Sequence, residues 1–200
     1  MMKQDLIIEF MPYHEALLRA WKNGDYSMLT NSKASDYIKN ILVSKARKRP
    51  SRRFFGEAYI ATKTEMVEGW YSSFKWLTSK KWITGKGLED EFERPFFEAL
   101  MRHIGKDILK ELQDRAKKIV ENGIHKKPVA PDLWLIDKNG HFKFIESKLP
   151  GDVINRHQIA GLALIKKCLS AVKPVAVSIV TLYPENFDPK SLFSEFYNLA

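Results

Sequence analysis

Apolar residues recur along this chain with two different spacings, one typical of helices and one typical of strands. A spacing of three to four residues predicts helices over residues 13–22, 35–47, 66–80, 96–120 and 156–170. Unbroken apolar runs predict strands that are buried on both faces over residues 133–136, 142–145 and 175–183. A short last helix is expected after Asp188 and Pro189. This order of helices and strands indicates an α/β protein with a mixed α+β sheet.

Local signals mark the ends of two of these helices. Pro95 favours the start of the fourth helix, and Asn-Gly at residues 122–123 favours its end. Asn155 with Gln158 three residues later matches a capping box at the start of the fifth helix. Compared with the fold that this order suggests, one edge strand is either missing or hidden within the loop of residues 78–87.

A turn at residues 138–140 joins the first two predicted strands, and its length decides which side chains share a face. A two-residue loop would place Asp132 opposite Ser147, so that Asp132 points away from Glu146. A three-residue loop with Gly140 in the left-handed conformation pairs Asp132 with Glu146. We expect the three-residue loop or an equivalent bulge.

The second predicted strand runs into Glu146, Ser147 and Lys148. Because side chains alternate along a strand, Glu146 and Lys148 share a face and Ser147 points to the other. A glutamate and a lysine at the end of a buried strand are costly unless they are paired or bind a ligand. Two carboxylates that hold a hard cation, with an ammonium beside the attacked phosphate, suit the hydrolysis of a phosphodiester. A polar hairpin with a surface ion pair is the alternative.

The spacing of these residues resembles a known nuclease signature. The chain has Pro131-Asp132 and then, after a gap of thirteen residues, Glu146-Ser147-Lys148. This arrangement is similar to the PD-(D/E)XK pattern. The continuation Leu-Pro-Gly-Asp at residues 149–152, with Gln158 on the next helix, resembles the VRR-NUC family within that superfamily. The likeness covers residues 127–181 and, loosely, residues 68–82. The chain departs from the family pattern at Ser147, where members usually have valine, and at Val129-Ala130, where glycine and leucine usually precede the Pro-Asp pair.

The resemblance implies a restriction-endonuclease-like core over residues 65–200, with a helical N-terminal extension over residues 1–64. It also implies a metal-dependent DNA endonuclease that serves DNA repair or recombination. In that interpretation Asp132, Glu146 and the carbonyl of Ser147 bind Mg²⁺ or Mn²⁺. Lys148 positions the attacking water or offsets the negative charge on the phosphate.

Members of the family add a glutamate from an upstream helix to the metal shell. Glu68, which lies in a similar Glu-Gly context, is the first candidate here, and Glu98 is the second. The alternative for Glu68 is an exposed glutamate in the first turn of a helix. Gln158 either points toward the metal site or a phosphate, as in the family, or only pairs with Asn155. Asp152 is expected to be a turn residue.

A basic segment provides the strongest signal for nucleic-acid binding. The chain has 33 Lys and Arg against 24 Asp and Glu, so its net charge of +9 favours polyanionic partners. The basic residues of the segment are Lys45, Arg47, Lys48, Arg49, Arg52 and Arg53. We expect them to contact phosphates, with Phe54 or Phe55 available to stack on a base. The alternative is a solvated helix end followed by two core phenylalanines.

Partners and location follow from the same features. The resemblance implies branched or single-strand-containing DNA as substrate, and a non-catalytic nucleic-acid-binding module on the same fold is the alternative function. No apolar run is long enough to span a bilayer, and the lone Cys168 is typical of a reducing compartment, so we expect a cytoplasmic protein without a membrane partner. A homodimer is expected, with the side of the last helix that carries Phe193, Phe196 and Tyr197 packing either on its own core or on a second subunit.

Overall fold

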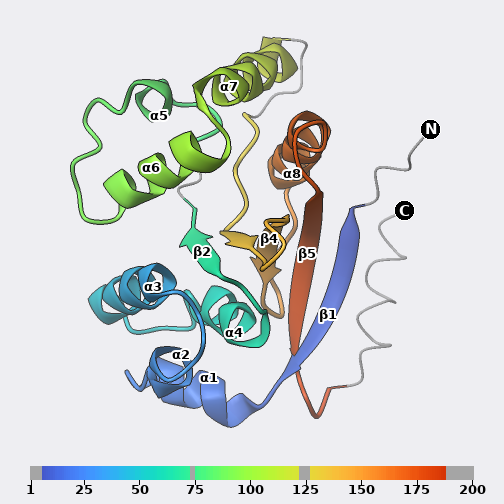
Figure 1. Ribbon diagram of the computed structural model, residues 1–200. Helices are drawn as coiled ribbons and strands as arrows, with labels where there is room; N and C mark the ends of the chain where they lie inside the picture. The colour runs from blue at the N-terminus through green and yellow to red at the C-terminus, as the bar shows by residue number, and fades with distance from the viewer. Residues whose placement is uncertain (1–5, 73–74, 122–126, 188–200) are drawn as a thin grey trace.

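Five strands form one mixed sheet in the computed structural model, which describes residues 6–72, 75–121 and 127–187 (Figure 1). The elements are β1 (Ile7–Tyr13), α1 (Glu15–Lys22), α2 (Ser27–Thr30), α3 (Asp36–Lys48), α4 (Phe55–Lys63), β2 (Glu68–Tyr71), α5 (Lys81–Thr84), α6 (Glu93–His103), α7 (Lys106–Glu121), β3 (Leu133–Ile136), β4 (Phe142–Lys148), α8 (Arg156–Leu169) and β5 (Val175–Pro184). The predicted mixed α/β class is therefore confirmed.

The strands lie in the order β1-β5-β4-β3-β2. β3 is antiparallel to both of its neighbours, β2 and β4, whereas β4, β5 and β1 run parallel. Helix α8 connects β4 to β5, because parallel neighbours need a crossover connection. This arrangement places the end of β4 beside the start of α8.

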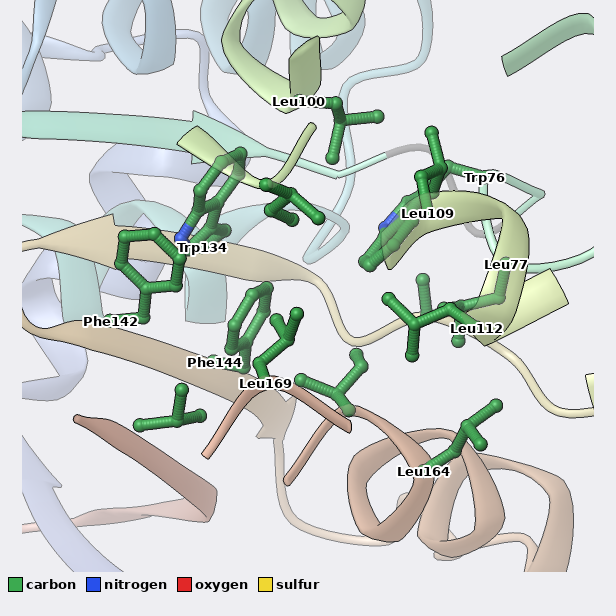
Figure 2. Packing of buried hydrophobic residues seen from close by; sticks show 14 of the residues in the cluster. Trp76, Leu77, Leu100, Leu109, Leu112, Trp134, Phe142, Phe144, Leu164 and Leu169 are labelled. Atoms are coloured by element: carbon green, nitrogen blue, oxygen red, sulfur yellow. The ribbon is translucent and has the colours of Figure 1, made fainter. Parts of the chain in front are cut away.

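Two hydrophobic clusters cover the two faces of the sheet. On one face, Trp134 and Phe144 stack with ring centroids 5.7 Å apart and pack with residues of α6, α7 and α8 (Figure 2). On the other face, Leu133 and Ile145 pack with residues of α1, α2, α3 and α4. The alternation of side chains along β3 and β4 thus buries both faces, as the unbroken apolar runs predicted.

The register of the β3–β4 hairpin is the predicted one. Leu133 pairs with Ile145 and Ile136 pairs with Phe142, which leaves a three-residue loop at residues 138–140. Gly140 has a φ of +76° and its N–H donates to the carbonyl of Asp137. Extending the same register toward the open end of the hairpin places residue 132 opposite residue 146.

Several helix and strand predictions are confirmed with small shifts at their ends. They are the helices now labelled α1, α3 and α8 and the strands β3, β4 and β5. At the start of α8, the backbone N–H of Asn155 donates to Oε1 of Gln158 at 3.0 Å, as a capping box requires. The last predicted helix, with Phe193, Phe196 and Tyr197, lies outside the described residues.

The predicted helix over residues 66–80 is wrong. Residues 68–71 form β2, which pairs with β3, and residues 75–78 form a turn that buries Trp76. Pairing with β3 takes the place of the predicted helical turns. Gly69 packs closely there, since a Cβ at this position would lie 2.5 Å from Met66, 2.6 Å from Ile38 of α3 and 3.2 Å from Leu135 of β3.

The predicted single helix over residues 96–120 is also wrong. It is divided into α6 and α7, and Gly105, with a φ of +84°, lies between them. A left-handed glycine after the last turn is a common helix end, and the apolar spacing continues across it without showing the break.

The remaining differences concern the strands at the edges of the sheet. Residues 78–87 contain α5 and no strand, so an edge strand is not hidden in that loop, and β1 and β2 form the two edges. The predicted helical extension over residues 1–64 contains α1, α2, α3 and α4, but it also contributes β1 to the common sheet. Neither β1 nor α4 was predicted from the pattern.

Candidate active site

Two predicted carboxylates lie side by side at the open end of the β3–β4 hairpin. Asp132 precedes β3, and its Oδ2 accepts the backbone N–H of Ser147 at 2.9 Å. Residue 132 lies opposite Glu146, so both carboxylates extend from the same face of the sheet. The Ser147 hydroxyl lies on the opposite face, where α4 packs. The structure therefore brings Asp132, Glu146 and Ser147 together.

Glu146 belongs to a buried polar network with Lys148 and Gln158. Glu146 is 2 % exposed and Lys148 is 7 % exposed. The ammonium of Lys148 donates to Oε1 of Glu146 at 2.9 Å and to Oε1 of Gln158 at 3.2 Å. Nε2 of Gln158 donates to the same oxygen of Glu146. Gln158 thus pairs with the N-cap residue Asn155 and also forms hydrogen bonds with Glu146 and Lys148.

A third carboxylate, Glu57, was not among the predicted site residues. It lies in the first turn of α4, whose Gly56 packs so closely on β4 that a Cβ there would be 2.3 Å from the hydroxyl oxygen of Ser147. Helix α4 lies beside the sheet in Figure 1. The one sequence feature that could have indicated Glu57 as a site residue is its position as a single acid within the otherwise apolar sequence Phe-Gly-Glu-Ala-Tyr at residues 55–59.

The three carboxylates of Glu57, Asp132 and Glu146 are called the carboxylate cluster below. Burial, followed by the negative charge of Asp132, raises the pKa of Glu57 to about 8 and the pKa of Glu146 to about 7. Burial also raises the pKa of Asp132, while the N–H of Ser147 and the charge of Lys148 oppose that change. Among the described residues Glu146 and Lys148 are the only charged side chains that are fully buried, whereas Glu57 and Asp132 are partly exposed.

The cluster fits a divalent cation of the hard class. Within residues 6–72, 75–121 and 127–187, no three or more His, Cys, Asp and Glu side chains are grouped as a complete metal-binding set. Magnesium, however, is usually held by one or two carboxylates and completes its shell with water and substrate phosphate oxygens. Asp132 and Glu146 could supply two such oxygen ligands.

Glu68 and Glu98 lie away from the cluster. Glu68 pairs with Ile136 in the sheet, four strand positions from Asp132, which corresponds to ~13 Å. Its carboxylate forms ion pairs with Arg102, at 2.5 Å, and with His103. Glu98 is paired with Arg94 on α6. The structure therefore brings neither of these glutamates to Asp132 and Glu146.

Arg52 connects the basic segment to the rim of the site. Its guanidinium donates to the carbonyl of Pro150 at 3.0 Å and forms an ion pair with Asp152 at 2.9 Å. Asp152 also accepts the N–H of Leu149 at 2.9 Å, so it acts as the predicted turn residue. The Arg52 side chain is thereby occupied within the chain and links the loop before α4 to the loop after β4.

The other basic residues differ in their surroundings. Lys45 lies with its ammonium 5.7 Å from the ring centroid of Tyr71, a residue whose pKa is raised by burial and by the carboxylate cluster. Arg47, Lys48, Arg49 and Arg53 are exposed. Phe55 is fully buried and cannot stack on a base, which corrects that part of the prediction. Phe54 is partly buried against Tyr71.

One cavity of the described chain lies away from the carboxylate cluster. Its volume is about 1060 Å³, and it is lined by the hairpin turn and by residues 62–67, without any member of the cluster.

Comparison of the chain with protein-family models, with curated proteins and with solved structures gave no match. Among the helices of the described residues, none has the length and apolar character needed to cross a membrane. Trp82 is fully buried within the described chain, and Trp70 packs against the same core, so both side chains are used inside one chain.

Proposed function

We propose that this protein is a metal-dependent nuclease that hydrolyses phosphodiester bonds in DNA. The observation that carries the proposal is the pairing of Asp132 with Glu146 across the hairpin, with Lys148 hydrogen-bonded to Glu146. The order β2-β3-β4 followed by α8 and β5 also supports a restriction-endonuclease-like core of the PD-(D/E)XK type. Branched or single-strand-containing DNA is the proposed substrate class.

In this proposal Asp132 and Glu146 hold Mg²⁺ or Mn²⁺. When bound, the cation would lower the pKa of a water molecule and offset negative charge on the phosphate. Lys148 turns its ammonium toward a non-bridging phosphate oxygen, and Gln158 keeps Lys148 and Glu146 in place. Glu57, with its pKa raised into the neutral range, can accept a proton from the attacking water. The carbonyl of Ser147 stays a proposed ligand.

Cleavage of labelled junction, flap, single-stranded and duplex DNA in Mg²⁺, Mn²⁺ or EDTA tests the proposal. We expect cleavage that requires the metal, and we expect Asp132→Asn and Glu146→Gln each to abolish it. DNA binding in EDTA should persist in both variants, because the carboxylates do not attract phosphate. Glu68→Gln is the matched control and should cleave normally, since Glu68 pairs with Arg102 outside the site. Full activity of the Asp132 or Glu146 variant would contradict the proposal.

A non-catalytic nucleic-acid-binding module is the second candidate. One observation favours it: the described residues contain no complete set of three metal-binding side chains. Lys148 would then act only as the ion-pair partner of Glu146. Binding of DNA without cleavage under all metal conditions would select this function over the nuclease.

A further inference from the structure

A basic groove lies between α3 and the start of α6. Its volume is about 700 Å³. Its α3 side is lined by Asn40, Ser44, Arg47 and Lys48. The last three follow Asn40 by four, seven and eight positions, so all four lie on one face of the helix. Phe92 lines the opposite side. The groove therefore combines hydrogen-bond donors, two exposed cations and an aromatic ring.

The charge of the groove suits a polyanion. Arg47 and Lys48 are exposed and make no ion pair with the described residues. Lys39 also lines the groove and has only a long contact, of 3.8 Å, with Asp36. Glu91 is the one acid in the lining. Asn40 and Ser44 add neutral donors that can bond phosphate oxygens.

Lys45 and Tyr71 connect the α3 side of the groove to the candidate active site. Lys45 comes from the same turn of α3 as Arg47 and Lys48, and its ammonium lies over the ring of Tyr71. Tyr71 pairs in the sheet with Leu133, the residue that directly follows Asp132. A strand whose phosphodiester reaches Asp132 can therefore extend past Tyr71 toward the groove.

Phe92 distinguishes a single strand from a duplex. Its ring is partly exposed and is held edge-on against Tyr37, with centroids 6.5 Å apart. The Tyr37 hydroxyl donates to the backbone carbonyl of Phe92 at 2.9 Å, which fixes the backbone that carries the ring. Stacking on an aromatic ring requires an unpaired base, because the faces of paired bases are covered by their neighbours in the duplex.

We propose that this groove binds a single-stranded stretch of nucleic acid that flanks the phosphodiester to be cleaved. Arg47 and Lys48 contact consecutive phosphates, and Phe92 stacks on a base. The inference rests on the proposed nuclease function for the role of the flanking strand. The binding itself is measured without metal, so that its failure can be separated from a failure of the nuclease proposal.

The first test measures the affinity of the full chain for labelled oligothymidylate and for a blunt-ended duplex in EDTA, over a range of salt concentrations. We expect Arg47→Gln/Lys48→Gln to weaken binding of the single strand. The slope of log affinity against log salt should fall by about 1.4, since each lost contact with a single strand contributes about 0.7. The matched control is Lys106→Gln/Lys118→Gln, which removes two exposed charges from α7 and should change the slope far less. Equal effects of the two double variants would overturn the proposal.

The second test separates stacking from charge. We expect Phe92→Leu to weaken oligothymidylate binding by roughly 5- to 100-fold and to leave duplex binding unchanged. Phe187→Leu, at an exposed phenylalanine after β5, is the control and should bind normally. Glu91→Gln should strengthen binding, because it removes the one acid of the lining. Equal losses for single strand and duplex in Phe92→Leu would overturn the single-strand assignment.

Two further outcomes keep the proposals distinct. If the wild-type protein cleaves no DNA but the groove variants lose oligothymidylate binding as expected, the nuclease proposal fails and the groove stands. If cleavage is metal-dependent but both groove variants bind oligothymidylate like the wild type, the groove inference fails.

Should Phe92→Leu not fold, as judged by its melting temperature, the double variant at the exposed residues Arg47 and Lys48 still tests the groove. A comparable loss of affinity for poly-glutamate in Arg47→Gln/Lys48→Gln would assign the groove to acidic protein segments and overturn the proposal.

Discussion

Lys148 is held by two acceptors in a place where an unpaired ammonium would be costly. Glu146 and Gln158 both accept from its Nζ, and it is the only cation that is buried among the described residues. A buried ion pair of this kind contributes little net stability, because desolvation offsets most of the attraction. The pair therefore has a better explanation in the chemistry of the site than in the stability of the fold.

Lys148→Ala should slow the chemical step while the metal still binds. By analogy with the loss of one charge-stabilising donor, the expected loss is ~2.7–4 kcal/mol, or a factor of about 10²–10³ in single-turnover rate. Lys143→Ala is a control on the same strand, because Lys143 pairs with Glu9 away from the cluster. A normal rate at saturating metal, combined with weakened metal affinity, would show that Lys148 is only an ion-pair partner.

Glu57→Gln tests the residue that the sequence pattern did not reveal. Removing the charge while keeping the shape should lower the cleavage rate by about 10²–10⁴-fold if Glu57 accepts a proton. The pKa of Glu146 should stay near 7, because Glu57, with a pKa of about 8, is already protonated over the range in which Glu146 titrates. Titration of Glu146 by NMR checks that the variant leaves the rest of the site intact. An unchanged rate would show that Glu57 has no role in the reaction.

At the scale of elements, the site depends on how closely α4 approaches β4. Gly56 and Ser147 form that contact, and Glu57 follows directly in the same helical turn. Any widening between α4 and the sheet would therefore move Glu57 away from Asp132 and Glu146. Leu182 of β5 lies on the other side of Gly56, 3.2 Å from a Cβ built there.

Gly56→Ala should destabilise the protein by ~1–3 kcal/mol through overpacking. The added Cβ would lie 2.3 Å from the Ser147 hydroxyl oxygen but 3.6 Å from the Ser147 Cβ. The double variant Gly56→Ala/Ser147→Ala should therefore recover much of the loss, because the clashing oxygen is removed. Chemical denaturation of the single and double variants gives the coupling energy. Strictly additive effects would show that the strain lies against Leu182 instead.

Local sequence signals were sufficient for the hairpin and for the residues that it positions. The glycine at residue 140 fixed the loop length, and the loop length placed Asp132 opposite Glu146. The same holds for Gln158, whose capping position is set by residues only three apart.

Features that depend on distant contacts could not be predicted in this way. Residues 68–71 form a strand that pairs with β3, and Gly69 packs there against Ile38 and Leu135, which are far away in the sequence. Glu57 reaches the site because Gly56 packs on Ser147. Neither contact changes the spacing of apolar residues along the chain. In both cases the residue that matters is a glycine, which is neither apolar nor polar in a hydrophobicity pattern.

At the scale of the whole molecule, the carboxylate cluster makes stability depend on pH. Glu146 binds its proton more tightly in the folded protein, with a pKa of about 7, than in the unfolded chain, and the pKa values of Glu57 and Asp132 are also raised. The folded state then holds more protons than the unfolded state between the ordinary carboxyl range and about pH 7. Linkage requires the free energy of unfolding to fall as pH rises through this interval.

We therefore expect the contribution of the cluster to the melting temperature of the metal-free protein to fall from about pH 5 to about pH 8, by ~2–4 °C for each kcal/mol of stability lost. Glu146→Gln should reduce this fall, because an amide does not titrate. Added Mg²⁺ or Mn²⁺ should raise the melting temperature more at the higher pH, where it competes with fewer protons. Thermal melts in EDTA and in metal check all three expectations. A steeper fall with pH in Glu146→Gln than in the wild type would contradict the assignment.

The placement of β1 has a consequence for how the chain folds during synthesis. Within the described sheet β1 has one neighbour, β5. Ile7 therefore cannot form its strand pairing until Ser178 and all the residues between them have been synthesised. Pairings between such distant segments raise the contact order and slow folding, and they leave strand edges exposed in the meantime. A nascent chain that stops before Val175 would present β1 without a partner and β4 with one open edge. Such truncated chains should associate with chaperones or aggregate.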